Sequence, residues 1–362
     1  MTLKHMAEYR DAALAQTLLE KIRGASRRPV RLMEVCGTHT VSIFRSGIRS
    51  LLPGTITLLS GPGCPVCVTD QAEIDAFVAL ARQPDVILAT FGDLMRVPGS
   101  RSSLQRERAE GRDIRVVYST LDALEIARAH PGRTVVFLGV GFETTAPTVA
   151  AAIAAAAAQK VENFTVFSAH KLVPPALEAL MTGGAPGVDG FILPGHVSVI
   201  IGLEAYRPFF ERHRTPCAVA GFEPTDILQA VAELTAQVGQ GRADLVNCYP
   251  RAVGAQGNPR ALELMTQVFA PADAAWRGIG VIPASGLAIR QAYAAHDAGR
   301  RFALDLPEPK VPAGCACGQV LTGRITPPEC ALYRKACTPM APVGPCMVSS
   351  EGTCAAYYRY HA

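Results

Sequence analysis

The sequence predicts an α/β fold in which two similar units, each with a parallel sheet, precede a cysteine-rich iron–sulfur or zinc segment. Short runs of almost wholly apolar residues alternate with segments of helical length from residue 30 to residue 220. Such runs are typical of parallel strands that helices cover on both faces. The pattern fades after Asn247, and glycine, proline and cysteine dominate the chain beyond Leu306.

The expected elements follow an amphipathic helix at the N-terminus, whose packing the sequence leaves open. We expect strands at residues 30–35, 56–59, 86–89, 116–118, 135–138, 164–167, 190–193 and 217–220. Two Gly-Phe-Glu segments, at 141–145 and 221–225, each follow an apolar run and open a helix, which indicates a weak internal repeat. The chain is therefore divided into an N-terminal helix (1–25), a first α/β domain (26–128), a second α/β domain (129–243) and a cysteine-rich domain (244–362).

Composition narrows the class of protein. A length of 362 residues suits two or three domains, at about 150 residues per domain. The net charge of +4 is too small, and the basic residues too scattered, to predict nucleic-acid binding. No apolar run reaches the roughly 18 residues that a membrane span needs, and the N-terminus lacks the apolar core of a signal peptide. We expect a cytoplasmic protein that is a monomer when alone.

Eleven cysteines in such a compartment point to metal or redox chemistry, because structural disulfides are rare there. The loop Gly61-Pro62-Gly63-Cys64-Pro65-Val66-Cys67 holds two of them at a C-x-x-C spacing between a buried strand and a helix. The partial positive charge of a helix N-terminus is expected to lower the pKa of these thiols. A thiolate can act as a nucleophile, a metal ligand or the reduced half of a disulfide. The alternative is two small buried residues in a turn.

A second motif, Cys36-Gly37-Thr38-His39-Thr40, also lies between a strand and a helix. Cys36 and His39 are a soft and a borderline metal ligand close together, and Gly37 lets a ligand approach the backbone. The alternative is a capped helix with a buried cysteine.

The segment Gly139–Thr145 resembles a phosphate-binding turn only superficially, since it lacks the glycine and lysine residues that such turns use. We expect a helix start there, capped by Thr144. His170 and His196 follow strands, so they are further candidates for the same cleft.

Six cysteines crowd the end of the chain, in a segment so rich in proline that it cannot easily pack a core of its own. A metal centre held by four thiolates would order such a segment. Iron–sulfur and tetrahedral zinc are both open at this point, and spacing alone does not choose four ligands from six. Six buried free thiols are the remaining alternative. The cysteines are Cys315, Cys317, Cys330, Cys337, Cys346 and Cys354.

Taken together, these motifs resemble the HypD family of [NiFe]-hydrogenase maturation proteins. The resemblance rests on residues 36–40, 61–67, 141–145 and 194–198, and on four tail cysteines separated by 14, 6 and 16 residues. These features occur in order over nearly the whole chain, and their combination is specific although no single one is.

The resemblance implies a scaffold with redox activity, rather than a conventional turnover enzyme, on which the Fe(CN)2CO unit of the hydrogenase is assembled. It implies two partners, a small HypC-type chaperone and a HypE-type cyanide donor, and a third domain with a [4Fe-4S] cluster. The family's central iron-site cysteine falls on Cys36, and its redox-active pair on Cys64 and Cys67, which are also candidate metal ligands. Its cluster ligands fall on Cys315, Cys330, Cys337 and Cys354, which leaves Cys317 and Cys346 as non-ligands.

Four further residues are expected to support this chemistry. Glu143, Thr144 and Thr145 are candidates to hydrogen-bond the ligands of the iron, and His39 lies within reach of Cys36. Because sequential strands are often neighbours, the Cys36 and Cys64 motifs should lie close together. Two other functions use the same residues. One is a stand-alone, cluster-dependent thiol–disulfide reductase, and the other is a zinc-stapled interaction module without redox activity.

Overall fold

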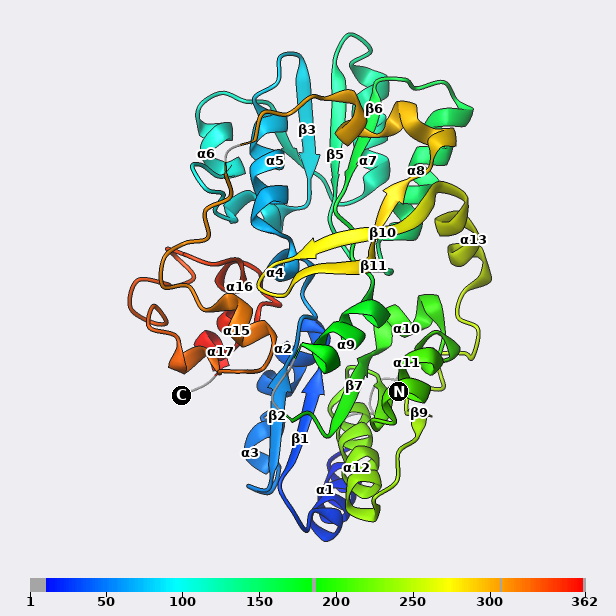
Figure 1. Ribbon diagram of the computed structural model, residues 1–362, viewed down its shortest axis with the longest axis vertical. Coiled ribbons are helices and arrows are strands. Elements are labelled where there is room, and N and C mark those ends of the chain that lie inside the picture. The colour runs from blue at the N-terminus through cyan, green and yellow to red at the C-terminus, as the bar shows by residue number, and fades with distance from the viewer. Residues whose placement is uncertain (1–10, 184–186, 307, 361–362) are drawn as a thin grey trace, which may run out of the picture.

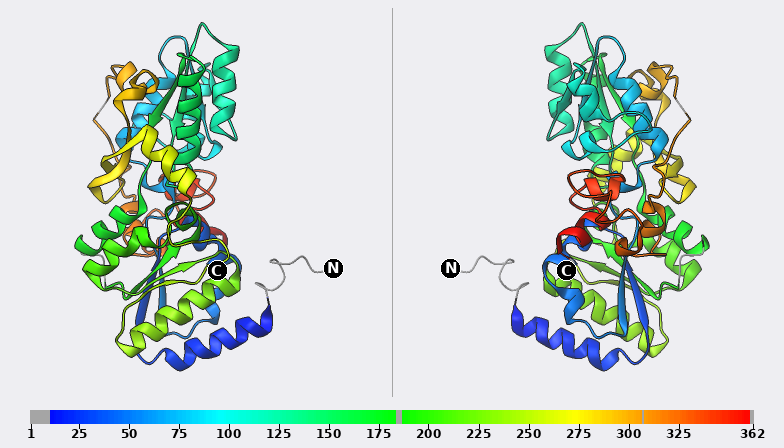
Figure 2. Two further views of the ribbon diagram at one scale, coloured as in Figure 1. Left: turned by 90° about the vertical axis from the view of Figure 1, so that its right-hand side faces the viewer. Right: turned by 90° about the vertical axis from the view of Figure 1, so that its left-hand side faces the viewer.

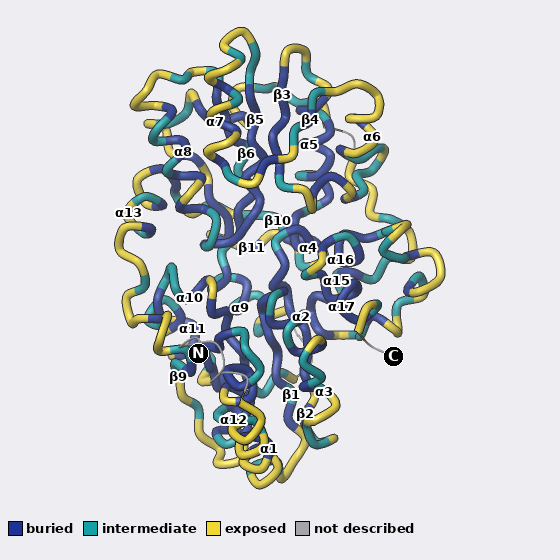
Figure 3. Tube along the Cα trace, turned by 180° about the vertical axis from the view of Figure 1, so that it is seen from behind, coloured by how far each residue is buried: buried dark blue, intermediate teal, exposed yellow. Residues whose placement is uncertain are grey.

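The structure is a computed structural model that describes residues 11–183, 187–306 and 308–360. It contains two parallel sheets, one toward each end of the elongated molecule, with an antiparallel hairpin running across the space between them (Figure 1). The expected α/β class with parallel sheets is confirmed. Figure 3 shows the buried stretches concentrated along the strands and in the middle of the molecule, where the site lies.

The first sheet has five strands, and each neighbouring pair is parallel. In spatial order they are β2 (Ile56–Ser60), β1 (Val30–Glu34), β7 (Gly190–Pro194), β8 (Cys217–Ala220) and β9 (Leu245–Asn247). The N-terminal helix α1 (Ala12–Ala25) packs beside α12 (Pro224–Gln240) at this end of the molecule (Figure 2). Leu18 and Ile22 of α1 are buried in the same apolar cluster as Leu32 of β1. The packing of α1 is therefore settled: it belongs to the first sheet.

The second sheet has four parallel strands. In spatial order they are β4 (Ile114–Val116), β3 (Val86–Thr90), β5 (Thr134–Gly139) and β6 (Phe164–Ser168). Its helices include α5 (Gln71–Ala81), α6 (Leu104–Ala109), α7 (Thr120–Ala129) and α8 (Ala146–Ala158). The strand expected at residues 116–118 begins two residues earlier, and Tyr118 is almost fully exposed.

The two sheets are interleaved along the chain, which differs from the expected consecutive units 26–128 and 129–243. The chain forms β1 and β2, builds the whole second sheet from β3 to β6, and then returns to the first sheet with β7, β8 and β9. An apolar run shows that a strand exists but not which strand it pairs with, because pairing depends on contacts distant in sequence. A division at residues 128 and 129 therefore does not match the sheets.

A hairpin that the sequence analysis missed joins the parts of the molecule. It comprises β10 (Phe269–Trp276) and β11 (Gly280–Ile289). At its tip Trp276 forms a β-bridge with Thr69, and its indole stacks on Phe142, with ring centroids 6.1 Å apart. The hairpin thus touches both the segment after the C-x-x-C motif and the loop after β5.

The cysteine-rich segment consists of short helices and turns. Its helices are α15 (Cys317–Leu321), α16 (Pro345–Val348) and α17 (Thr353–Tyr360), with a 3-10 turn at Pro327–Glu329. The sequence suggested little apolar packing here, but Leu321, Met347 and Tyr357 are buried in the same cluster as Phe44 and Leu59 of the first sheet's side of the molecule. The segment therefore shares a core with the α/β part, although it has no large core of its own.

The remaining helices connect these elements. They are α2 (Gly37–Arg45), α3 (Ile48–Leu51), α4 (Pro65–Val68), α9 (Val173–Thr182), α10 (Gly195–Ile201), α11 (Arg207–His213), α13 (Pro259–Val268) and α14 (Ala298–Arg301), with 3-10 turns at Gly92–Arg96, Glu204–Tyr206 and Gln291–His296. Among the described residues, every helix is too short or too polar to cross a bilayer.

The contact between the hairpin tip and α15 yields a stability prediction. A Cβ atom on Gly318 would lie 2.6 Å from the Cα atom of Gly278, so Gly318→Ala must push two backbones apart. We expect a loss of about 1–3 kcal/mol in the free energy of unfolding, measured by denaturant titration. Gly24→Ala in α1 is the matched control, because nothing lies within 4 Å of its Cβ position. It should stabilise the protein by about 0.5–1 kcal/mol, as alanine usually does in a helix. Equal effects of the two substitutions would contradict the prediction.

Candidate functional site

The site begins where β1 and β2 end side by side. The two strands pair in parallel from Val30 and Ile56 to Glu34 and Ser60, so the segments that follow them start at the same edge of the sheet. The two loops bond to each other, since the Gly37 N–H donates to the Gly63 carbonyl at 2.9 Å. A Cβ atom on Gly63 would lie 2.1 Å from the backbone nitrogen of Cys36. Glycine at position 63 therefore permits this close approach, and the two cysteine motifs are neighbours.

Cys36 occupies the N-cap position of α2, and its side chain is buried. Burial raises the pKa of its thiol to about 12, and the nearby carboxyl groups of Glu34 and Glu351 act in the same direction. Burial likewise raises the pKa of Cys67 well above its ordinary value. The expected lowering by the helix N-terminus is therefore wrong for these two thiols, because loss of water outweighs a helix-end effect. A bound cation would favour the thiolate form of such buried thiols, because it would compensate their charge.

Cys64 and Cys67 are held at contact distance by α4. Cys64 caps this single-turn helix, with its sulfur accepting from the Cys67 N–H at 3.4 Å. The two sulfur atoms are 2.6 Å apart, and both side chains are buried. Disulfide formation between them needs little movement of the backbone.

Further thiols continue from this pair into the cysteine-rich segment. Cys346 of α16 interacts through its thiol with Cys317, Cys354 and Cys67, and its pKa is raised well above the ordinary value, chiefly by Cys317. The sulfur atoms of Cys317 and Cys315 are 3.3 Å apart. The two cysteines that the resemblance left as non-ligands thus lie between the C-x-x-C pair and the other tail cysteines. Their position depends on α16 packing against α4, which sequence spacing does not reveal.

The four expected cluster ligands line one cavity. Cys315, Cys330, Cys337 and Cys354 surround it together with Cys317. The cavity is small, with a volume of about 10 Å³. Gly344 backs the cavity. A Cβ atom on Gly344 would lie 2.6 Å and 2.7 Å from the sulfurs of Cys317 and Cys315.

The donor set of this cavity, the four expected thiols and that of Cys317, suits a metal centre held by thiolates. Within residues 11–183, 187–306 and 308–360, no group of three or more His, Cys, Asp or Glu side chains is placed to hold one metal ion. A single zinc ion needs four ligands about 2.3 Å from one point. A four-iron cluster binds its four cysteine thiolates around a volume, and the cavity is lined by thiols.

Neutral and aromatic groups surround the Cys36 motif on its other side. His39 is fully buried, and its Nε2 lies 2.9 Å from the Gly221 carbonyl. Burial lowers the pKa of His39 to about 4, so the ring is neutral, Nε2 donates to that carbonyl, and Nδ1 is an acceptor without a partner among the described residues. Phe222 stacks on His39 at 4.7 Å and on His196 at 3.8 Å between ring centroids. His39 and His196 therefore pack on the same Phe222 ring.

Two carboxyl groups near Cys36 had no role in the sequence analysis. Glu34 accepts from the Thr40 hydroxyl at 2.5 Å and from the Cys36 N–H at 3.1 Å, and burial raises its pKa to about 7. Glu351, from the turn before α17, accepts from the Thr38 hydroxyl at 2.7 Å. Its only sequence signal is its position three residues before Cys354. The cysteine-rich segment therefore supplies a polar group directly to the Cys36 motif.

The Glu143 motif of the second sheet approaches the same region. Glu143 Oε1 accepts from the Val173 N–H at 2.9 Å, while Oε2 is buried without a partner among the described residues. Burial raises the pKa of Glu143 to about 7. Phe142, next to Glu143, stacks on Trp276, whose backbone pairs with Thr69 after the C-x-x-C motif. The motif thus lies near the segment that follows Cys67.

The two threonines beside Glu143 are arranged differently from the expectation. The N-cap of α8 is Thr145, whereas Thr144 was expected to cap it. No side-chain cap bond forms, and the Thr145 hydroxyl donates to the Phe142 carbonyl at 3.2 Å. Thr144 and Thr145 are both partly exposed, so they line the loop without being fixed in the core.

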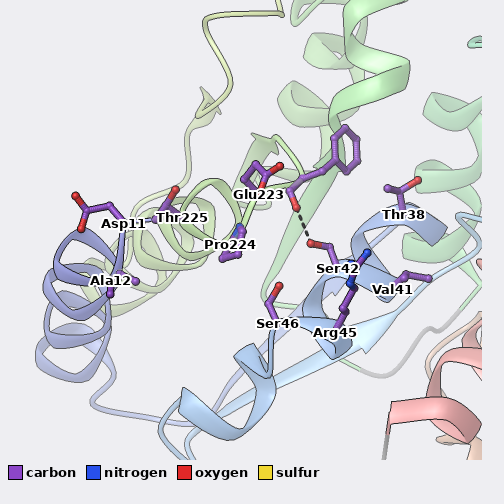
Figure 4. Close-up of a pocket in the computed structure, with 12 residues that line it drawn as sticks. Asp11, Ala12, Thr38, Val41, Ser42, Arg45, Ser46, Glu223, Pro224 and Thr225 are labelled. Carbon is purple, nitrogen blue, oxygen red and sulfur yellow. Dashed lines mark hydrogen bonds between the residues drawn. The ribbon is translucent and has the colours of Figure 1, made fainter. Parts of the chain in front are cut away.

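The outer face of α2 borders an open pocket (Figure 4) of about 540 Å³. Thr38, Ser42 and Arg45 of α2 line one side, and the Ser42 hydroxyl donates to the Phe222 carbonyl at 2.5 Å. The first residues of α12 and of α1 line the other side. Helix α2 therefore carries Cys36 at its start and presents a different face to this pocket.

Comparison with known proteins gives one consistent result. A family model described as "HypD: Hydrogenase formation hypA family" matches residues 13–361. The chain is similar to "Hydrogenase maturation factor HypD" of Rhodobacter capsulatus, at 48% identity over 99% of this chain and 98% of that protein. It is similar to the protein of the same name from Rhizobium leguminosarum bv. viciae, at 46% identity over 99% and 96%. A putative hydrogenase expression/formation protein of Methanocaldococcus jannaschii is 42% identical over 98% and 99%.

The buried carboxyl of Glu143 predicts a pH-dependent stability. Its pKa is about 7 in the folded chain and near 4.5 when unfolded, so the folded state keeps a proton that the unfolded state releases between these values. Below pH 4.5 both states hold this proton, and the full stability is present. As the pH rises from 4.5 to 7, only the folded state still holds the proton, so the free energy of unfolding falls. Relative to Glu143→Gln, the wild-type chain should lose about 3 kcal/mol of unfolding free energy across this window.

Denaturant titrations from pH 4.5 to pH 8 measure this difference. A glutamine side chain at this position would keep an acceptor for the Val173 N–H, so the fold should tolerate the substitution. Glu20→Gln, at an exposed position of α1, is the control and should give a constant offset. A constant offset for Glu143→Gln as well would show that Glu143 is ionised in the folded chain throughout.

Proposed function

The chain belongs to the HypD family of hydrogenase maturation proteins, and from that premise we propose that it is the scaffold on which the Fe(CN)2CO unit of a [NiFe]-hydrogenase is assembled. One observation carries the proposal. The Cys36 loop and the Cys64–Cys67 loop meet at the ends of two adjacent strands, and the cysteine-rich segment closes over both. Cys36, the Cys64–Cys67 pair and the cysteine-rich segment are thereby gathered at one junction, which supports the proposal.

In this proposal Cys36 binds the iron that is being built upon. Thiolate is a soft ligand that suits iron carrying cyanide and carbon monoxide. One thiol from this chain leaves most coordination positions open for incoming ligands. Neutral His39 and the Thr38–Glu351 pair stand beside the motif and fix its shape, because their protons are already donated within the protein. Glu143, whose buried Oε2 has no partner among the described residues, and Thr144 and Thr145 are the candidates to hydrogen-bond those ligands.

The dithiol pair supplies the redox activity in this proposal. Oxidation of Cys64 and Cys67 forms one S–S bond and releases two electrons and two protons, which serve the ligand chemistry at the iron. The pair starts close to contact distance, so this change is local. Cys315, Cys330, Cys337 and Cys354 would hold a [4Fe-4S] cluster, which supplies one-electron transfer when bound. The thiols of Cys317 and Cys346 fill the space between the pair and that cavity.

Two partners complete the proposal. A small HypC-type chaperone provides the remaining iron ligands and carries the iron unit away, and a HypE-type protein delivers cyanide. The chain acts on its partners in the cytoplasm as a scaffold, and it is a monomer when alone. The Cys36 thiol is buried, so a partner that binds the iron must come into close contact with this motif.

The cluster assignment predicts a contrast among the six tail cysteines. Single substitution of Cys315, Cys330, Cys337 or Cys354 by serine should bleach the broad absorption near ~400 nm that thiolate-ligated clusters show, because one thiolate is lost. Cys317→Ser and Cys346→Ser are matched controls in the same segment, and both should keep the cluster. Absorption spectra with iron and sulfide analysis of anaerobically purified protein measure the contrast. Full colour in all four ligand variants would refute the assignment.

The iron assignment predicts the behaviour of Cys36→Ala. This variant should keep its fold and its tail cluster, yet the complex purified with its partner should lack the Fe–CN and Fe–CO stretching bands in the infrared. Cys248→Ala removes another buried thiol, outside the cysteine motifs, and should keep the bands. Unchanged bands in Cys36→Ala would show that Cys36 is not the ligand of the iron and would point to Cys64 and Cys67 instead.

A further inference from the structure

Arg277, at the tip of the β10–β11 hairpin, is a buried cation. Its side chain is only 5% exposed. Nε donates to the Thr69 carbonyl and Nη1 donates to Gln71 Oε1, both at 2.8 Å. Nη2 is buried and has no hydrogen-bond partner among the described residues. Both acceptors are neutral amide oxygens, so these bonds fix the guanidinium in place without balancing its charge.

An uncompensated buried charge is costly, and a guanidinium does not escape the cost by losing a proton. Proteins therefore place buried arginines beside an anion or an anionic ligand. Arg277 cannot turn outward easily, because its own backbone N–H donates to the Val68 carbonyl at 2.9 Å and the side chain is bonded to the following segment. The negative charge that balances Arg277 must therefore be supplied by a group that binds beside it.

The hairpin tip stands directly against the cysteine-rich segment. Gly278, the next residue, packs on Gly318 so closely that a Cβ atom on it would lie 2.1 Å from the Gly318 Cα atom. Gly318 follows Cys317, which lines the thiol cavity. The hairpin tip that carries Arg277 therefore packs against the wall of the thiol cavity.

We propose that Arg277 is the counter-charge of the cluster held in the thiol cavity, and that its free Nη2 proton stabilises the reduced form of that cluster. The inference rests on the proposed function, because it requires the cluster. Four thiolates make the bound group anionic, and one added electron makes it more so without breaking a bond. A fixed cation in a buried site favours the more negative state, so it raises the midpoint potential. The guanidinium keeps all its protons throughout.

An electrostatic role for Arg277 and a merely structural role predict different experimental results. If Arg277 only ties the hairpin to Thr69 and Gln71, then substituting Arg277 and substituting Gln71 should change the potential of the cluster by similar amounts. If its charge acts on the cluster, the neutral variants Arg277→Met and Arg277→Gln should change the potential, while Arg277→Lys and Gln71→Leu should change it much less. Gln71→Leu is the matched control, because it deletes the acceptor of Nη1 and leaves the charge in place.

The experiment is an anaerobic redox titration of the full-length chain, with dithionite as the one-electron donor and the EPR signal of the reduced cluster as the readout. Arg277→Met and Arg277→Gln should bind iron and sulfide but reduce less readily, by a factor of ten or more, which is about 59 mV for a one-electron couple. Loss of iron from the neutral variants, with retention in Arg277→Lys, would equally support the role of the charge. Neutral variants that titrate at the wild-type potential would overturn the inference alone. A wild-type chain that binds no cluster would overturn the cluster assignment with it.

Discussion

The parallel pairing of β1 with β2 is the constraint on which the site depends. It brings two loops that begin 27 residues apart, at Gly37 and Cys64, to one edge of a sheet, where the Gly37 N–H bonds to the Gly63 carbonyl. The absence of a side chain at Gly63 lets the loops touch. The carboxyl edge of a parallel sheet is where α/β proteins commonly bind ligands, because loops there can vary without disturbing the strands. Here that edge is covered by the cysteine-rich segment and by the hairpin tip, which completes an enclosed junction.

The features that the sequence could predict were those that depend on residues close together in the chain. The apolar runs located eight strands, because most of these strands are buried on both faces and their residues show this locally, β4 at the sheet edge being an exception. They did not show that β7 returns to pair with β1 after a whole sheet has intervened, since nothing local encodes a partner. The hairpin escaped notice because Ala270, Ala272 and Ala274 carry little of the alternation that marks a strand. The cysteine motifs were evident from spacing, whereas Glu351 and the position of Cys346 became evident only from tertiary packing.

At the thiols, the local effect of a helix N-terminus and the tertiary effect of burial change the pKa in opposite directions. A helix N-terminus typically stabilises a nearby negative charge by about 0.3–1 kcal/mol. A rise in the pKa of Cys36 from 9.0 to about 12 corresponds to about 4 kcal/mol against the thiolate. Burial therefore wins, and the helix α4, with only four residues, adds little at Cys67. A thiol that is so hard to ionise by itself becomes a thiolate when a metal cation arrives, so the burial that suppresses free reactivity favours metal-linked ionisation.

The same reasoning explains why the site is divided among distant parts of the chain. Cys36 and Cys64 come from the first sheet, Glu143 from the second, Arg277 from the hairpin and Cys346 from the tail. Each of these groups is held out of water by its neighbours, and a buried polar or charged group that lacks a partner costs several kcal/mol. The tail has few apolar residues beyond those it shares with the α/β part, so it gains order from both that shared core and its thiols. Folding of the tail and closure over Cys36 are thus coupled through the same contacts, and in the proposed function the loading of metal would be coupled to them as well.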